Sequence, residues 1–148
     1  MSEMTVLTEE LKLIVFQLVD KEYAIPVNQV RSIEKLQYIT RVPKTPPYVK
    51  GVINLRGVVT PIIDLRSKFD LTPAEPSDGT RVIIAGLQDK EVGLIVDAAN
   101  DVLDVSRDSI EPPPEVVGVV EAEYIGGVVK QDRRLLILLQ LDKILQSL

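Results

Sequence analysis

Hydrophobic residues occur along the chain as short runs rich in valine and isoleucine, separated by polar turns. Two pairs of these runs each flank the tripeptide Asp-Lys-Glu: Leu13–Val19 with Tyr23–Val27, and Val82–Leu87 with Val92–Val96. Short apolar runs on either side of a polar turn are typical of β-hairpins. Ten prolines also interrupt the chain too often for long helices. The pattern therefore predicts an all-β protein.

Two further hairpins are predicted, one in each half of the chain. Gly51–Ile53 and Val58–Leu65 flank Asn54–Gly57, whose Asn and Gly favour the positive φ angles of a tight turn. Gly127–Val129 and Leu135–Leu141 flank a polar segment in the same manner.

The order of these units repeats along the sequence. Shifting Leu13–Ile33 forward by about 69 positions, and Tyr48–Phe69 by about 76, aligns apolar with apolar residues and both Asp-Lys-Glu turns. We therefore expect an internal duplication with subdomains at 13–70 and 80–148, inside a single domain that spans 1–148. Chance similarity between β-rich segments is the alternative.

Each copy contains about five short strands and a brief helical end, at Ser67–Phe69 or Asp142–Leu148. This content predicts two SH3-like five-stranded β-barrels, in which closure removes most free strand edges. Barrels of about 60 to 70 residues have marginal cores. We therefore expect the two barrels to pack together, with neither half folding alone.

The composition excludes several kinds of chemistry. The 148 residues include no Cys and no His, which excludes disulfides, Cys/His zinc sites, cysteine nucleophiles and Ser-His-Asp triads. The net charge of -5 argues against a general nucleic-acid binder. No segment approaches the roughly 20 apolar residues that cross a bilayer, and residues 1–10 do not resemble a secretory signal. We expect a cytoplasmic protein with no direct membrane insertion.

No candidate catalytic or cofactor site stands out. Asp97, Asp101, Asp104 and Asp108 recur at short intervals but lack the alternation of a calcium loop, so we interpret them as a solvated face. Gly126 and Gly127 lack the Lys-Ser/Thr ending of a phosphate-binding loop. We therefore expect no cofactor, no metal and no enzymatic activity.

Arg56 is the residue of the Asn54–Gly57 turn that structure does not require. It is permanently charged and is carried at the tip of a hairpin among apolar neighbours, which suits a hydrogen-bonding anchor for a partner. An ordinary solvated turn arginine is the alternative. Pro61, in the following strand, lacks an amide hydrogen and predicts an edge strand or a bulge.

Together these segments resemble the CheW family of bacterial chemotaxis coupling proteins over almost the whole chain. The segments that carry the resemblance are Phe16–Val30, Thr45–Tyr48, Asn54–Gly57, Pro61–Arg66, Val92–Asp97, Asp101–Leu103 and Leu135–Leu139. The resemblance implies a non-catalytic scaffold of two SH3-like subdomains. It also implies two partners, the cytoplasmic helical tip of a chemoreceptor and the regulatory domain of the histidine kinase CheA, which is expected to alternate with the scaffold in rings under the receptor array.

The resemblance also implies two sets of site residues. The receptor groove between the subdomains falls on Val30, Ile33, Gly51, Arg56, Gly57, Val82, Ala99 and Val102. The kinase-binding loop falls on Glu111, Glu115 and Val116. Ser32 stands where relatives often carry an acidic residue, and some relatives carry a basic residue and an aromatic at the positions of Glu111 and Val116.

A small β-barrel peptide-binding module of another signalling system remains the alternative function. Such a module, or a binder of single-stranded nucleic acid, needs an aromatic platform. Aromatic residues make up only 4% of this chain, and Trp is absent.

Overall fold

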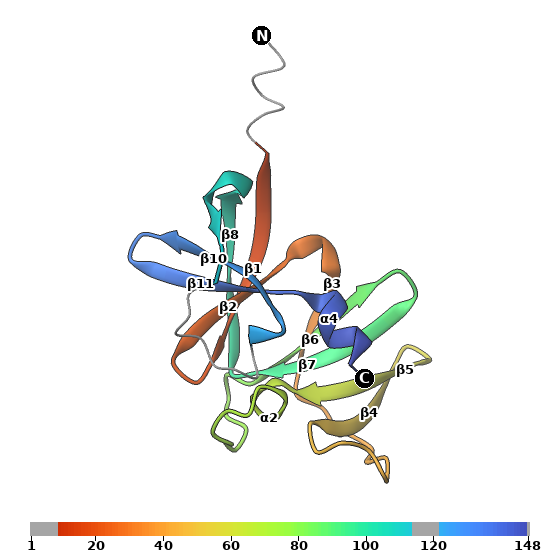
Figure 1. The fold of residues 1–148 in the computed structure, drawn as a ribbon. Coiled ribbons are helices and arrows are strands. Elements are labelled where there is room, and N and C mark those ends of the chain that lie inside the picture. The colour runs from red at the N-terminus through yellow and green to blue at the C-terminus, as the bar shows by residue number, and fades with distance from the viewer. Residues whose placement is uncertain (1–8, 114–121, 148) are drawn as a thin grey trace.

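The computed structural model describes residues 9–113 and 122–147, whose strands form two sheets (Figure 1). The six-stranded sheet has the order β8 (Ala98–Ser106), β1 (Glu10–Leu18), β2 (Lys21–Pro26), β11 (Arg134–Leu139), β10 (Ile125–Gln131) and β9 (Ile110–Glu111). The five-stranded sheet has the order β3 (Val30–Lys35), β6 (Arg81–Leu87), β7 (Lys90–Val96), β5 (Val58–Asp64) and β4 (Val49–Leu55). The helical segments are short: η1 (Val27–Gln29), α2 (Leu65–Lys68), η2 (Arg107–Ser109) and α4 (Leu141–Gln146). The all-β class predicted from the sequence is confirmed.

The two sheets have equivalent strand orders. In the repeat, β3, β6, β7, β5 and β4 of the five-stranded sheet correspond to β8, β1, β2, β11 and β10. These five strands follow one another in the same order in the six-stranded sheet, and β9 is added at the end. Each sheet also contains one parallel pair, β5 with β7 and β2 with β11. In both sheets the register shifts by one residue where the edge strand β3 or β8 begins to pair. These equivalences support a duplication, which we retain as a proposal.

Each sheet is built from both halves of the chain. The β1–β2 hairpin lies in one sheet with β8, β10 and β11, whereas the equivalent β6–β7 hairpin lies in the other sheet with β3, β4 and β5. The sheets therefore do not follow the ranges 13–70 and 80–148, because the two ranges exchange their first hairpins. Neither range holds all the strands of one sheet.

Buried apolar side chains form one large core between the sheets and a smaller core on the far face of each. The shared core joins both sheets, with residues such as Phe16 and Ile63, and α2 and α4 pack into it. A smaller cluster around Leu13 covers the other face of the six-stranded sheet, and one around Val82 covers that of the five-stranded sheet. Most of the apolar burial that stabilises the fold thus depends on the two sheets being together.

The closed barrels predicted from the sequence are not found. In the described residues, β3 and β4 are the edges of one sheet and β8 and β9 are the edges of the other, with no pairing between them. Connecting segments lie instead along the outer sides of β4 and β10. Thr40 and Val52 exchange two backbone hydrogen bonds of 2.9 Å at the outer edge of β4, and β9 pairs with the outer edge of β10.

Pro61 does not lie in an edge strand, because β5 is between β7 and β4. The pairing of β5 with β7 begins only at Ile62. The missing amide hydrogen of Pro61 therefore breaks no bond to β7, and the proline is tolerated inside the sheet.

Candidate partner-binding site

Four apolar residues expected at the receptor groove occupy equivalent positions on the edge strands β3 and β8. Their cross-strand partners are Ala85 for Val30, Ile83 for Ile33, Phe16 for Ala99 and Ile14 for Val102. Directly opposite residues of an antiparallel pair share one face of the sheet. All four partners belong to the shared core, so the four side chains lie on the faces that are turned toward it.

Two of these side chains remain accessible to a partner. Ile33 is 40% exposed and Val102 is 53% exposed, whereas Val30 and Ala99 are half-buried against the shared core. Strand β8 also contacts β6, the neighbour of β3, so these edges of the two sheets lie close together. Val30, Ile33, Ala99 and Val102 thus extend the shared core to the solvent, and we call them the β3–β8 surface.

Arg56 lies at the tip of the β4–β5 hairpin, with its side chain 83% exposed. The turn has the conformation predicted from the sequence: the Gly57 amide donates a hydrogen bond of 2.9 Å to Asn54 Oδ1, and Gly57 has a φ of 86°. The Arg56 guanidinium is 4.0 Å from Glu34 Oε2 on β3. An exposed pair at this distance contributes little to stability. The hairpin therefore holds a cation beside β3 that remains available for binding.

Gly51 and Val82 are buried within the five-stranded sheet. A Cβ atom at Gly51 would lie 2.0 Å from the carbonyl oxygen of Thr40, and Gly51 has a φ of 142°. Val82 is 2% exposed and packs in the small core on the far face of the five-stranded sheet. Neither residue is accessible to a partner in this conformation.

The residues expected to bind the kinase are described only in part. Glu111 ends β9 and is exposed, and its carboxylate lies 3.8 Å from Lys130 Nζ on β10. Glu115 and Val116 lie outside the described residues.

A family model described as a CheW-like domain matches residues 12–148. The chain belongs to the CheW-like family. It is 52% identical over 136 residues to the chemotaxis protein CheW of Bacillus subtilis (strain 168), covering 92% of this chain and 87% of that protein. It is 38% identical over 134 residues to the chemotaxis protein CheW of Klebsiella aerogenes, covering 90% and 81%. The crystal structure of the scaffolding protein TtCheW from Thermoanaerobacter tengcongensis matches with a TM-score of 0.82 and 34% identity, covering 88% of this chain and 89% of that one.

The ion pair between Arg66 and Asp97 was not predicted from the sequence, although both residues lie in the segments that carry the resemblance to the CheW family. Asp97, at the junction of β7 and β8, accepts hydrogen bonds from Arg66 Nε at 2.9 Å, Arg66 Nη2 at 2.6 Å and the Val19 amide at 2.7 Å. Burial raises the pKa of Asp97, but the bonds from Arg66 and Val19 outweigh it and lower the pKa overall. Asp97 thus ties the turn of the β1–β2 hairpin to helix α2, which follows β5 of the other sheet.

A second ion pair joins three strands of the six-stranded sheet. Arg134 on β11 donates to both oxygens of Glu22 on β2, at 3.0 and 2.7 Å, and lies 2.9 Å from Asp101 on β8. The hydrogen bonds from Arg134 lower the pKa of Glu22. Sequence spacing could not reveal this pair, because residues 22 and 134 become neighbours only through the exchange of hairpins.

The acidic residues at 97–108 do not form a metal site. Asp97 and Asp101 pair with arginines, and Asp104 lies 3.3 Å from Lys12 Nζ. Within residues 9–113 and 122–147, no group of three or more acidic, His or Cys side chains is placed to hold a metal ion. The helices of this part of the chain are also too short and too polar to cross a membrane.

Proposed function

We propose that this CheW-like chain is a non-catalytic chemotaxis scaffold that couples the helical tip of a chemoreceptor to the histidine kinase CheA. Similarity to proteins named chemotaxis protein and scaffolding protein supports this proposal. The absence of His and Cys leaves no side chain for a phosphoryl-accepting imidazole or a thiol nucleophile. The scaffold would act in the cytoplasm and be recruited to membrane-associated receptor arrays.

The observation that carries the proposal is the pair of exposed apolar residues, Ile33 and Val102, at equivalent edges of the two sheets. A receptor helix placed along the β3–β8 surface would cover both residues with its apolar side. Burying these two residues would supply binding affinity but would not fix the position of the helix along the surface, since hydrophobic burial is not directional. Arg56, next to β3, would fix the register of the helix by hydrogen bonding.

The scaffold would transmit signals through differences in affinity. A chain without a switchable centre of its own can shift a kinase equilibrium only by binding two receptor or kinase states unequally. The coupling energy in such a link is typically about 1 to 3 kcal/mol. Glu111, on the edge strand β9, would meet the CheA regulatory domain together with Glu115 and Val116. The opposite end of the scaffold would meet the next copy of that domain in the ring.

The test measures how strongly two surface variants bind each of the two partners. Ile33→Asp and Val102→Asp should each weaken binding of a receptor cytoplasmic fragment by at least about tenfold, since each places an unpaired charge against an apolar helix face. The same variants should bind the isolated CheA regulatory domain like the parent. Leu135→Asp is the matched control, because Leu135 is 42% exposed on β11, which β1 and β2 separate from β8 in the six-stranded sheet.

Unchanged receptor binding in both variants would show that the β3–β8 surface is not the receptor site. If the parent bound neither the receptor fragment nor CheA, the alternative of a peptide-binding module in another signalling system would replace the scaffold proposal.

A further inference from the structure

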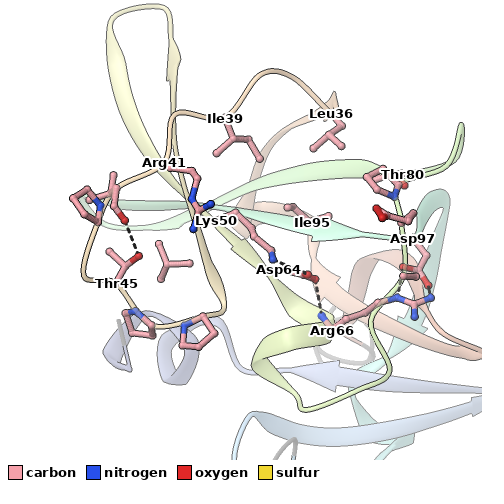
Figure 2. Close-up of a pocket in the computed structure, with 18 of the residues that line it drawn as sticks. Leu36, Ile39, Arg41, Thr45, Lys50, Asp64, Arg66, Thr80, Ile95 and Asp97 are labelled. Atoms are coloured by element: carbon pink, nitrogen blue, oxygen red, sulfur yellow. Dashed lines mark hydrogen bonds and ion pairs between the residues drawn. The ribbon is translucent and has the colours of Figure 1, made fainter.

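A cavity of about 810 Å³ lies beneath the segment that joins β3 to β4 (Figure 2). Residues of this segment form one wall, and the ends of β4 and β5 together with residues 74–76 form the others. Figure 2 shows Arg41 extending from the segment into this space, and Lys50 reaching from β4 toward Asp64. No role proposed above uses the cavity.

The cavity is distinct from the β3–β8 surface because it opens on the other face of the five-stranded sheet. Its apolar lining includes Leu36, Ile39 and Ile95, which pack against the small core on that far face. Ile33, by contrast, lies on the face turned toward the shared core. A ligand in the cavity and a helix on the β3–β8 surface would therefore occupy opposite faces of one sheet.

The cavity carries cations that the fold does not neutralise. Among the described residues, no carboxylate is within ion-pair distance of Arg41 or Lys44, and Lys50 is 3.9 Å from Asp64. The two other charged groups at the inner end, Arg66 and Asp97, neutralise each other. Glu75 is the remaining carboxylate of the lining. The lining thus keeps an excess of positive charge in a chain whose net charge is -5.

This charge is not a property that the repeated fold requires. Residues 35–50 contain Lys35, Arg41, Lys44 and Lys50 and no acidic residue. The equivalent stretch of the second repeat, 104–126, contains six acidic residues and a single arginine. Both stretches connect equivalent strands, so the strand arrangement alone does not require the positive charge of residues 35–50.

We propose that this cavity is a docking site for an extended, acidic segment of a partner protein, in which Asp or Glu alternates with apolar side chains. Arg41 and Lys44 would pair with the carboxylates, and Ile39, Val42 and Ile95 would contact the apolar side chains. A volume in the range of drug-sized ligand sites is too large for one inorganic anion, and the apolar part of the lining would remain uncovered by it.

The wall formed by the connecting segment is stiff, which favours a site that exists before binding. Pro43, Pro46 and Pro47 restrict its backbone. The segment is also anchored by the two hydrogen bonds between Thr40 and Val52 and by the bond from the Val49 amide to the Pro46 carbonyl, at 2.9 Å. A preformed site loses less conformational entropy when an extended peptide binds.

The test uses fluorescence anisotropy with a labelled hexapeptide of alternating glutamate and leucine, and a second hexapeptide with glutamine in place of glutamate. The acidic peptide should bind the full chain saturably and more weakly as salt is raised, and the glutamine peptide should bind at least about tenfold more weakly. The double variant Arg41→Gln/Lys44→Gln should lose about tenfold in affinity for the acidic peptide. Lys143→Gln, which removes one charge from the exposed face of α4, should bind it like the parent.

The proposal is overturned if the acidic peptide does not saturate, if the double variant binds it like the parent, or if free citrate displaces it fully at equal carboxylate concentration, since the site would then recognise small anions only. Receptor-fragment binding is measured on the same double variant. Unchanged receptor binding is expected, so a failure of the scaffold proposal and a failure of this one give different results.

Discussion

The ion pair between Arg66 and Asp97 should be worth more to this fold than any exposed pair. We predict that Asp97→Asn destabilises the protein by about 2 kcal/mol. Asparagine keeps the shape of the side chain but removes the charge that faces Arg66, whose side chain is only 16% exposed. Removing one partner of a fully buried pair typically costs about 3 to 5 kcal/mol. Asp97 is 29% exposed, so solvent reduces that cost.

This loss should be visible as a change in melting temperature. For a chain of this size, each kcal/mol corresponds to about 2 to 4 °C, so the midpoint should fall by about 4 to 8 °C. The matched control is Asp104→Asn, which removes the charge from an exposed pair, with Lys12 and Asp104 57% and 53% exposed. That change should shift the midpoint by less than about 2 to 4 °C, since exposed pairs contribute less than about 1 kcal/mol.

Acid should reduce the difference between the parent and Asp97→Asn. The folded protein lowers the pKa of Asp97 below that of the unfolded chain. The charged carboxylate therefore contributes stability above an unfolded pKa of about 4, and this contribution is lost as the pH falls through the lower folded pKa. Urea unfolding measured from pH 7 down to pH 2 should show the two curves converging. Equal stability of the two proteins at pH 7 would refute the reasoning, and so would a difference that does not change with pH.

Other changes test the Asn54–Gly57 turn, the close contact between Gly51 and Thr40, and the exchange of hairpins between the sheets. Arg56→Ala should leave the melting temperature nearly unchanged and weaken receptor binding about tenfold or more, whereas Gly57→Val should impair both, because a β-branched residue resists a φ of 86°. Gly51→Ala should lower the free energy of unfolding by about 2 to 4 kcal/mol, measured by urea titration, since its Cβ would lie 2.0 Å from the Thr40 carbonyl oxygen. The fragment 1–70 should show no cooperative melt, because β1 and β2 pair with strands that it lacks.

The local structure could be predicted from the sequence because hairpins are local. The Asn54–Gly57 turn, the runs beside the Asp-Lys-Glu tripeptides and the helical ends all depend on residues close in the chain. The arrangement of the strands in the sheets could not be predicted in this way, and the expected closed barrels were wrong. Periodicity shows which residues of a strand share a face, but it does not identify the strand that lies next to it. The exchange of the first hairpins depends on pairing between strands that are far apart in the sequence.

The candidate site was predictable in part. The family resemblance selected the β3–β8 surface, and two of its four residues are exposed. It also selected Gly51 and Val82, which are buried, because residue type alone does not reveal whether a valine or glycine is accessible. The tie between Asp97 and Arg66 could have been suspected, since both residues follow apolar strands. Their contact, however, depends on the path of the chain between the sheets.

The exchange of hairpins also determines when this protein can fold during its own synthesis. The first hairpin ends at Pro26, yet its parallel neighbour β11 extends to Leu139. At about 5 to 20 residues per second, a ribosome needs roughly 6 to 20 s to add the intervening chain. Strand β1 has no partner outside its own hairpin until β8 is complete at Ser106, and β2 lacks its second neighbour for the whole of that time. A nascent chain of this kind should depend on protection from aggregation until its last strand emerges.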